Sequence, residues 1–381
     1  MERFCTRVLE YFEGDKLRLG FAPQRLMFKV MGCFWWKKPT LLQRIYGSFY
    51  WIGLQLLTLI SVISFILNTN IKTAEDFTQI VNSLIVLMPF MMGIIKVEVL
   101  HINSTNFKAM VDFLESFPHD GTIFPAGHKF FINTSCNLIT IGSWSVYGVM
   151  TRGYLWYAVF PWDTSTTLGH GLGIVLQIVS ALPAGSTHLM IGSVMVAAVE
   201  RLRPQINKLK VVFSKIGPNP EDNKHIIKEA VDLHSAIKRG VYLINNAIAI
   251  IFMVKVLSLV PLICINAFVI TKVADIHYIV TNLLPMSLCV CGELYMFFGS
   301  GQILESEIED MDHVCYDNEW YLAPVEDRRK LSIIIECSRK QLTINAYGIA
   351  YANNETLLAV VQQGYSYFLF LHTMADIIDS N

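Results

Sequence analysis

Metal-binding residue types occur near the carboxyl end of this 381-residue chain, but their spacing fits no closed metal site. His313, Cys315 and Cys337 do not follow the paired spacing of tetrahedral zinc sites, so we interpret them as solvated helix residues. Cys289 and Cys291 lie two positions apart within an apolar stretch, a pattern typical of core packing. The sequence therefore predicts no bound metal and no cofactor.

The motif Gly299-Ser300-Gly301 is the nearest approach to a phosphate-binding loop. It lacks the strand before it and the Lys after it that such a loop requires, so we interpret it as a hinge or a helix stop. No nucleophile stands beside a base in a recognisable arrangement. The sequence therefore predicts that the protein is not an enzyme.

Lys96 lies inside one of the long apolar stretches, where an unpaired charge is costly, and two further ionisable residues, Lys255 and Glu293, lie inside two others. Lys255 and Glu293 each lie about 15 residues from the predicted outer end of their stretch, so the rise of about 1.5 Å per residue puts both at a similar depth. We expect them to pair, or to extend separately toward the membrane interface, as structural contacts rather than as an ion path.

Another set of residues has the character of a ligand pocket, with apolar and aromatic side chains and a few polar groups. Such a lining suits a small, mostly apolar ligand, and packing between helices is the alternative for any one of its members. The set consists of Val81, Asn82, Ile85, Met88, Trp144, Tyr147, Gly148, Thr151, Tyr154, Val175, Ile178, Tyr278 and Asn282.

The elements that must position these residues are seven apolar stretches, each near the ~20 residues that a helix needs to cross a bilayer. With 53% hydrophobic and 16% charged residues, the chain is too apolar for a soluble protein of this length. We predict an all-α membrane protein with seven transmembrane helices, at about 45–67, 78–97, 135–158, 172–198, 246–270, 277–299 and 353–373.

The positive charges are strongly segregated along the chain. Twenty-five of the 30 Lys and Arg residues fall in the amino-terminal segment or in every second connection, and three fall on the opposite side. Because positively charged loops stay in the cytoplasm, the amino terminus is predicted to be cytoplasmic and the carboxyl terminus extracellular. Neither the net charge of −1 nor any basic patch indicates a nucleic-acid partner.

The cytoplasmic connections 200–244 and 302–340 have helical patterning. Gly217-Pro218-Asn219-Pro220 predicts that the first contains two helices, which extend spans four and five into the cytoplasm. Residues 1–44 carry aromatic residues among cations, so we expect them to lie in the inner membrane interface; a plain cytosolic tail is the alternative.

The same topology makes predictions about covalent modification. All eight cysteines fall in predicted spans or on the cytoplasmic side, so no disulfide is expected. The glycosylation sequons at Asn103, Asn133 and Asn354 fall inside, at the inner boundary or in the last span, and we expect them to be unmodified. No signal peptide is expected.

The carboxyl-terminal part carries a series of motifs: Tyr316 and Trp320 ahead of Arg328-Arg329-Lys330-Leu331, then Gln341-Leu342-Thr343-Ile344-Asn345-Ala346, Thr356-Leu357 and Tyr365-Ser366-Tyr367-Phe368. Together they resemble the insect odorant receptor family, a set of inverted seven-helix ligand-gated cation channels. Phe160-Pro161-Trp162-Asp163 is similar to the aromatic-Pro turn that members carry after span three. The resemblance extends over the whole chain.

This resemblance implies a tetramer around a central pore lined by the last helix, formed with a shared co-receptor subunit, while the odorant lies within one subunit. Matching Ser366-Tyr367-Phe368 to the co-receptor's Thr-Tyr-aromatic sequence places Phe370, Thr373 and Met374 at pore-facing positions. The co-receptor has Gln where this chain has Thr373, which implies a ligand-tuned subunit. The implied location is the plasma membrane of olfactory sensory dendrites, in contact with membrane lipid.

On this basis we describe residues 1–381 as a single seven-helix channel subunit with four parts. The amino-terminal part, 1–44, is interfacial and cytoplasmic. The ligand-binding helices one to six, with their cytoplasmic extensions, span 45–299. A cytoplasmic anchor and assembly region spans 300–352, and the pore helix with its outer tail spans 353–381.

Three other classes are weighed against this interpretation. Gustatory receptor channels, which form homomers, usually end in Thr-Tyr, an apolar run and Gln-Phe, unlike this chain. A G-protein-coupled receptor requires an extracellular amino terminus and typically an external disulfide. A transporter typically shows an internal repeat, and none is visible. The ligand is expected to be a small volatile, and the aromatic residues of the set favour an aromatic one.

Overall fold

Helices form nearly all of the chain that the computed structural model describes, namely residues 21, 24–25, 41–42, 45, 53–70, 74–117, 135, 138–143, 145–146, 156, 158–216, 220–272, 276–317, 320–338 and 342–380. The long helices are α4 (Leu54–Asn68), α5 (Ala74–Ile102), α8 (Thr167–Phe213), α9 (Pro220–Lys272) and α14 (Asn354–Ser380). The shorter elements are α6 (Ser104–Glu115), α10 (Ile276–Tyr278), η2 (Ile279–Leu283), α11 (Leu284–Leu294), η3 (Tyr295–Gly299), α12 (Ser300–Tyr316), η4 (Trp320–Leu322), α13 (Val325–Ser338), β1 (Asn345–Ala346) and β2 (Ala350–Tyr351).

These helices occupy the apolar stretches of the sequence. The stretches 78–97, 172–198 and 246–270 lie within α5, α8 and α9, and the stretch 277–299 runs through α10, η2, α11 and η3 without a break. The stretch 135–158 is helical at its described positions up to residue 146, and Trp156 lies outside the helix. As expected from the Gly-Pro-Asn-Pro motif, α8 ends at Phe213 and α9 begins at Pro220.

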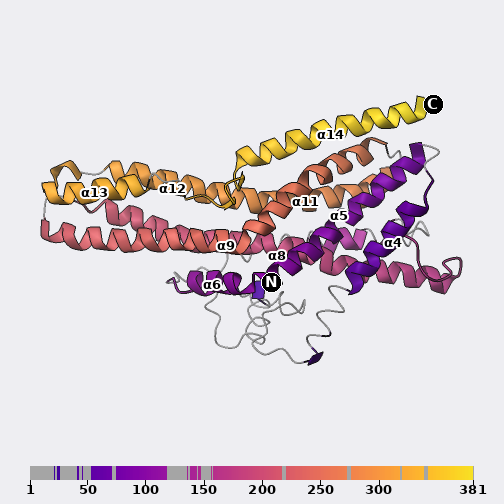
Figure 1. Ribbon diagram of the computed structural model, residues 1–381, viewed down its shortest axis with the longest axis horizontal. Helices are drawn as coiled ribbons and strands as arrows, with labels where there is room; N and C mark the ends of the chain where they lie inside the picture. Colours follow the sequence, from indigo (N-terminus) through magenta and orange to yellow (C-terminus); the bar gives the residue numbers. More distant parts are fainter. Residues whose placement is uncertain are drawn as a thin grey trace.

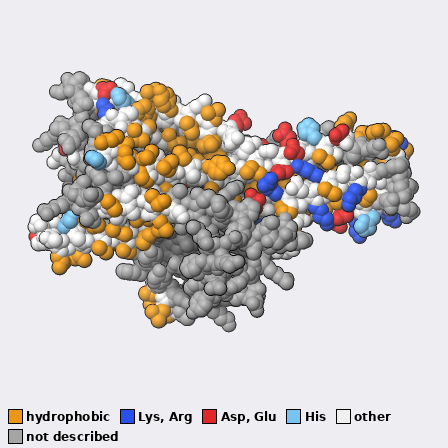
Figure 2. Space-filling model, turned by 180° about the vertical axis from the view of Figure 1, so that it is seen from behind, with side chains coloured by type: hydrophobic (Ala, Val, Ile, Leu, Met, Phe, Trp, Pro, Cys, Tyr) orange, Lys and Arg blue, Asp and Glu red, His pale blue; other side chains and the backbone are white. Residues whose placement is uncertain are grey.

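The molecule is elongated, and α8 and α9 run along most of its length (Figure 1). At one end they pack with α12 and α13, and at the other end they lie among α4, α5, α11 and α14. One half of the surface is dominated by hydrophobic side chains, whereas the narrower half carries interspersed Lys, Arg, Asp and Glu (Figure 2). An apolar exterior is stable against lipid and a charged one against water, so the two halves suit different surroundings.

Three clusters of buried apolar side chains hold the helices together. The largest joins α5, α6, α8, α9, α12 and the start of α14. A second lies between α4, α5, α8 and the helical segment that includes Ile141. The third joins α5, α9, η2 and α14, and it contains Val81 and Ile85 from the predicted pocket set.

The structure differs from the sequence-based expectation at three places. The Gly299-Ser300-Gly301 motif does not stop a helix, because η3 continues directly into α12. Helix α6 was not predicted, and its buried residues Phe107, Met110, Val111 and Leu114 pack on α8 and α9. In the amino-terminal segment, Phe21 and Gln24 are each only 1% exposed, a burial against the other helices that the sequence does not indicate.

Gly301 has a packing role that predicts a sharp effect of substitution. A Cβ at this position would lie 1.9 Å from the backbone oxygen of Ala352. We expect Gly301→Ala to displace the chain ahead of α14 and to destabilise the protein by roughly 1–3 kcal/mol. Thermal unfolding of the purified protein and its amount at the cell surface would measure this effect.

Gly299→Ala is the matched control for this prediction. A Cβ at Gly299 would meet only the Tyr295 ring, at 3.6 Å, which is an ordinary contact. Ala is also favoured over Gly within a helix, so this variant should be neutral or slightly stabilising. Equal stability of the two variants would contradict the close approach of α12 to Ala352.

Candidate functional site

The predicted pocket residues on α5 contribute to the contact between α5, α9 and α14. Val81 and Ile85 are buried in the cluster that includes Phe268 of α9 and Leu283 of η2. The same cluster contains Ala375 of α14, which is 1% exposed. Val81 and Ile85 therefore belong to the same apolar cluster as a residue of the last helix.

Other members of the pocket set are more dispersed. Ile178 packs against the second cluster, with Phe90 and Trp156, and Met88 of α5 is half-buried. Val175 is 57% exposed, and this exposure does not support its place in an enclosed pocket. For Asn82, Tyr278 and Asn282 only the helical backbone is described, and Trp144, Tyr147, Gly148, Thr151 and Tyr154 lie outside the described residues.

The predicted pore residues lie together on an outward face of α14. Phe370 is 61% exposed and Met374 is 40% exposed in the single chain, and Thr373 between them is exposed as well. The Thr373 hydroxyl donates a hydrogen bond to the backbone oxygen of Leu369, at 2.9 Å. Residues three and four positions apart share one face of a helix, so Phe370, Thr373 and Met374 form one exposed face that another surface could contact.

The opposite face of α14 packs against α9. A Cβ at Gly364 would lie 2.9 Å from Cγ2 of Ile263, so the two helices approach closely at this point. Near the end of both helices, Lys272 Nζ lies 2.7 Å from Asp376 Oδ1, and His372 Nδ1 lies 3.1 Å from Asp376 Oδ2. The hydrogen bond from Lys272 lowers the pKa of Asp376, so this carboxylate remains charged near neutral pH.

Charged residues inside the apolar half form one compact ion cluster. Lys255 Nζ of α9 lies 2.6 Å from Glu293 Oε1 of α11, and Lys96 Nζ of α5 lies 3.3 Å from the same oxygen. The exposed fractions are 1% for Lys96, 2% for Lys255 and 7% for Glu293. Lys255 Nζ also lies 4.9 Å from the centre of the Phe297 ring, within the range of a cation–π contact.

The expected pairing of Lys255 with Glu293 is therefore confirmed, and Lys96 is an additional partner that the sequence-based argument missed. All three residues lie on different helices, so a pattern within one helix cannot reveal the contact. The signal that could have found Lys96 is its own position inside a predicted span. An ionisable residue there usually has a partner.

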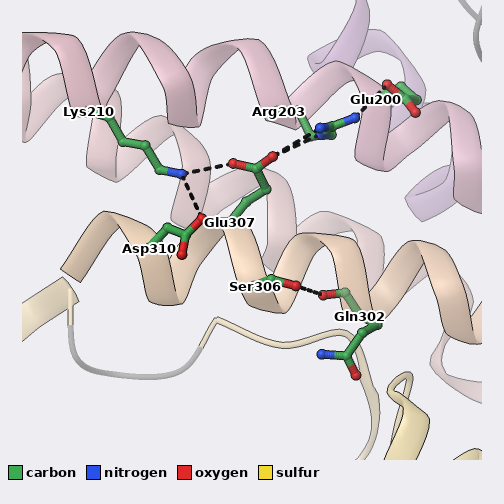
Figure 3. Close-up of polar contacts among 7 residues, drawn as sticks. All are labelled: Glu200, Arg203, Lys210, Gln302, Ser306, Glu307 and Asp310. Atoms are coloured by element: carbon green, nitrogen blue, oxygen red, sulfur yellow. Dashed lines mark hydrogen bonds and ion pairs between the residues drawn. The ribbon is translucent and has the colours of Figure 1, made fainter. Parts of the chain in front are cut away.

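A second ionic network ties α8 to α12 in the charged half (Figure 3). Glu307 accepts hydrogen bonds from Arg203 Nη2 at 3.0 Å and from Lys210 Nζ at 2.9 Å, while Arg203 also contacts Glu200 and Lys210 also contacts Asp310. Partial burial raises the pKa of Glu307, but the two hydrogen bonds outweigh this effect and leave the pKa below its ordinary value. The contribution of the network to stability is thus present at neutral pH and is lost as the pH falls through that lowered pKa.

Among the described residues, no group of three or more His, Cys, Asp or Glu side chains could hold a metal ion. The described cysteines Cys264, Cys289, Cys291 and Cys337 form no disulfide bond. The Thr140 hydroxyl and the Cys289 sulfur lie 3.2 Å apart, so this cysteine contributes to packing between α11 and the segment around Thr140. The contacts described so far are thus buried apolar clusters and ion pairs.

Comparison with known proteins identifies the class to which this arrangement belongs. Residues 76–365 match the sequence profile described as 7tm Odorant receptor, which covers most of the chain. The chain belongs to the odorant receptor family. Its members are membrane proteins that act as receptors, so the protein is an odorant receptor rather than an enzyme.

Two solved structures show the fold of this odorant receptor. The insect olfactory receptor OR5 from Machilis hrabei in complex with eugenol superimposes with a TM-score of 0.79 at 14% identity, over 96% of this chain and 100% of that one. A structure of the same receptor described without a ligand gives a TM-score of 0.78 at 15% identity, over 95% and 99%. No curated protein sequence matches the chain.

Two helical segments of the described chain are long and apolar enough to cross a membrane, Gln79–Ile102 and Asn223–Lys272. Gln55–Asn68 and Thr167–Leu182 are apolar helices of shorter length. In this odorant receptor, the ion cluster of Lys96, Lys255 and Glu293 therefore lies between helices of the apolar half.

The ion cluster makes a specific prediction for this receptor. Glu293→Gln removes the carboxylate and leaves two buried ammonium groups beside a neutral amide, which should destabilise the protein by about 3–5 kcal/mol. The variant should reach the cell surface in reduced amount and unfold at a lower temperature. Glu309→Gln, at an exposed position of α12, is the matched control and should change stability by less than about 0.5 kcal/mol.

A triple variant separates the loss of the countercharge from the loss of packing. Replacing Lys96, Lys255 and Glu293 together with Met removes all three charges and retains most of the apolar volume. Because well-packed apolar residues can replace a buried ion cluster, this variant should regain much of the lost stability. A Glu293→Gln receptor as stable as wild type would show that the carboxylate is not required.

Proposed function

We propose that this odorant receptor is a ligand-tuned subunit of an odorant-gated, non-selective cation channel that assembles with a co-receptor subunit into a heterotetramer. The observation that carries the proposal is the shared cluster of Val81, Ile85, Phe268 and Ala375. It joins helices that would surround a ligand to the helix that would line the pore. A small volatile bound beside Val81 and Ile85 would thus act on α14 through a single layer of side chains.

The proposed topology has seven transmembrane helices, a cytoplasmic amino terminus and an extracellular carboxyl terminus in the plasma membrane of olfactory sensory dendrites. The apolar half in Figure 2 would lie in the bilayer, and the charged half, including residues 300–352, would form a cytoplasmic anchor region. The Nδ2 of Asn103 donates to the backbone oxygens of Asn246 and Ala247 at 2.8 and 3.1 Å, so this sequon should stay unmodified on either side of the membrane. An amide group engaged between helices is a poor acceptor for a glycan.

The proposed ligand is a small, mostly apolar odorant. The OR5 receptor of similar fold is described in complex with eugenol, which supports a small odorant for this chain as well. The pocket would be formed by the thirteen residues of the predicted pocket set, of which Val81 is the first and Asn282 the last. Shape complementarity in such an apolar site discriminates weakly, by about 1–3 kcal/mol per methylene group, so related volatiles should compete.

The proposed gate consists of Phe370 and Met374 on the outward face of α14. When several subunits bring these faces together, a closed ring of apolar side chains excludes water and therefore ions. The Thr373 hydroxyl would contact a passing cation once the ring widens. A ligand shifts this equilibrium only by its difference in affinity for the two states, so the odorant must favour the arrangement in which α14 lies farther from the pore axis.

Current recordings from cells that express the receptor test this function. With a co-receptor present, we expect a subset of a panel of small volatiles to evoke cation currents, because the bound ligand opens the pore directly. Recordings from cells with the co-receptor alone, or with this chain alone, separate the contribution of each subunit. Transport of a volatile into the cell without current would indicate a transporter instead.

The pocket assignment predicts a change in odorant sensitivity without a change in conduction. Met88→Ala should shift the half-maximal odorant concentration by tenfold or more and reorder the panel, because it removes apolar contact from one wall of the site. Tyr147 and Tyr154 should behave alike. Met91→Ala, at an exposed position of the same helix, is the control and should leave the ranking unchanged.

The same recordings should show unchanged ratios of cation permeability for Met88→Ala. Altered permeability with an unchanged odorant ranking would place Met88 near the pore rather than in the pocket.

The gate assignment predicts an effect on the resting channel. Phe370→Ser or Met374→Ser places a smaller, polar side chain in the proposed ring, which makes the opening wider and easier to hydrate. Resting current should therefore rise several-fold, or divalent block should change. Leu369→Ser, at the adjacent exposed position, is the control. If both variants reach the cell surface in normal amount and show normal resting current, block and selectivity, these residues do not line the pore.

A further inference from the structure

A short hairpin connects the charged half of the molecule to α14. Strands β1 and β2 pair antiparallel, and the turn between them has positive φ at Tyr347 and Gly348, 55° and 74°. Asn345 Oδ1 accepts a hydrogen bond from the Gly348 backbone N–H at 2.9 Å, which closes the turn. Residues 342–354, which include most of the sequence motif 341–346, are called the hairpin segment below.

Besides apolar packing, the side chain of Asn245 binds the hairpin segment to α9 by hydrogen bonds. Its Nδ2 donates to the backbone oxygen of Thr343 at 3.0 Å, and its Oδ1 accepts from the backbone N–H of Asn345 at 3.1 Å. The amide of Asn245 therefore pairs with β1 as a neighbouring strand would, through one donor and one acceptor. An apolar side chain in place of Asn245 would leave the Thr343 oxygen and the Asn345 N–H without this partner.

The other side of the hairpin segment is bound to α12. Gln302 Oε1 accepts a hydrogen bond from the Asn354 backbone N–H at 3.0 Å, and Gly301 allows the Ala352 backbone to approach α12 closely. Asn353 Oδ1 accepts from the Thr356 N–H at 3.0 Å and so caps the first turn of α14. The backbone groups that begin α14 are thus satisfied by the hairpin segment and by α12.

Beyond this base, α14 is held mainly by α9. Ile344, Ala346 and Val360 are buried in the largest cluster, whereas many later side chains of α14 are exposed. Helix α9 therefore holds the hairpin segment near Asn245 and contacts α14 again at Ile263 and Lys272 (Figure 1). The same helix supplies Phe268 to the cluster that contains Val81 and Ile85.

We propose that Asn245 and Gln302 are positioning residues for gating, which couple α9 and α12 to the start of α14 through the hairpin segment. The inference rests on the proposed function, since it requires α14 to line the pore. A movement of α9 caused by ligand binding would then displace α14 in two ways. It would act on the first turn through the hairpin segment, and on the rest of the helix through the face that packs on α9. If the two residues serve folding alone, their loss should change the number of receptors at the surface but not how each receptor responds.

The test compares Asn245→Ala with Asn246→Ala in the full-length receptor expressed with its co-receptor. Asn246 is the next residue of α9 and is exposed. At matched surface amount, Asn245→Ala should shift the half-maximal odorant concentration by about 5- to 150-fold or change resting current, with the ranking of the odorant panel unchanged. Asn246→Ala should respond as wild type does.

A pair of variants at Gln302 keeps the inference testable if Asn245→Ala does not reach the surface. Gln302→Leu removes the oxygen that accepts from Asn354, whereas Gln302→Glu retains an acceptor oxygen and places negative charge at the amino end of α14, where it is favourable. We expect Gln302→Leu to show the shift and Gln302→Glu to restore a response near that of wild type.

The outcomes distinguish the two levels of the argument. A wild-type receptor without any odorant-evoked current would remove the proposed function and this inference with it. If the wild type conducts and the Asn245→Ala and Gln302→Leu variants keep its half-maximal concentration and resting current, the inference is wrong and the proposed function stands. A reordered odorant ranking in these variants would also overturn the inference, because it would place the effect in the ligand site.

Discussion

In the apolar half of the molecule, three helices meet at one carboxylate, that of Glu293. Two lysines from α5 and α9 approach the same oxygen, so the contact favours one depth of each helix relative to the other two. Apolar packing alone is less directional, since one aliphatic contact can replace another. The ion cluster therefore favours one register of the three helices, even though well-packed apolar residues could hold them together.

Helix α9 then carries this register to the rest of the structure. It packs with α5, α6, α8, α13 and α14 and with the hairpin segment. Its continuity across Pro261 is consistent with close support from its neighbours on both sides. The proposed pocket residues and the proposed pore residues would thus be connected through one continuous helix.

Much of the helical fold is predictable from the sequence, because long apolar runs depend only on composition along the chain, whereas the number of spans and their orientation stay predictions. The helical hairpin of α8 and α9 followed from its Gly-Pro-Asn-Pro motif, and the pairing of Lys255 with Glu293 followed from the cost of burying charge. The ligand and pore residues remain proposals. They depend on how several helices, and several subunits, face one another.

Other features could not be predicted, for physical reasons that differ from case to case. Helix α6 is only 12 residues long, so its amphipathic pattern was overlooked beside the stronger apolar stretches. The π-helical turns η2 and η3 add a residue to a helical turn without any distinctive sequence. The contacts of Lys96, Asn245 and Gln302 are all between elements distant in sequence, and each uses a common residue type.

The unbroken course of α9 has a consequence for how such receptors can diversify. Each residue of an α-helix turns the chain by about 100°, so one inserted or deleted residue between Asn245 and Lys272 would rotate every contact beyond it away from its partner. Changes of length should therefore be excluded from this stretch and confined to the connections between helices. New odorant preferences would then arise by exchange of side chains on the helices packed around α9, while the length of α9 stays constant.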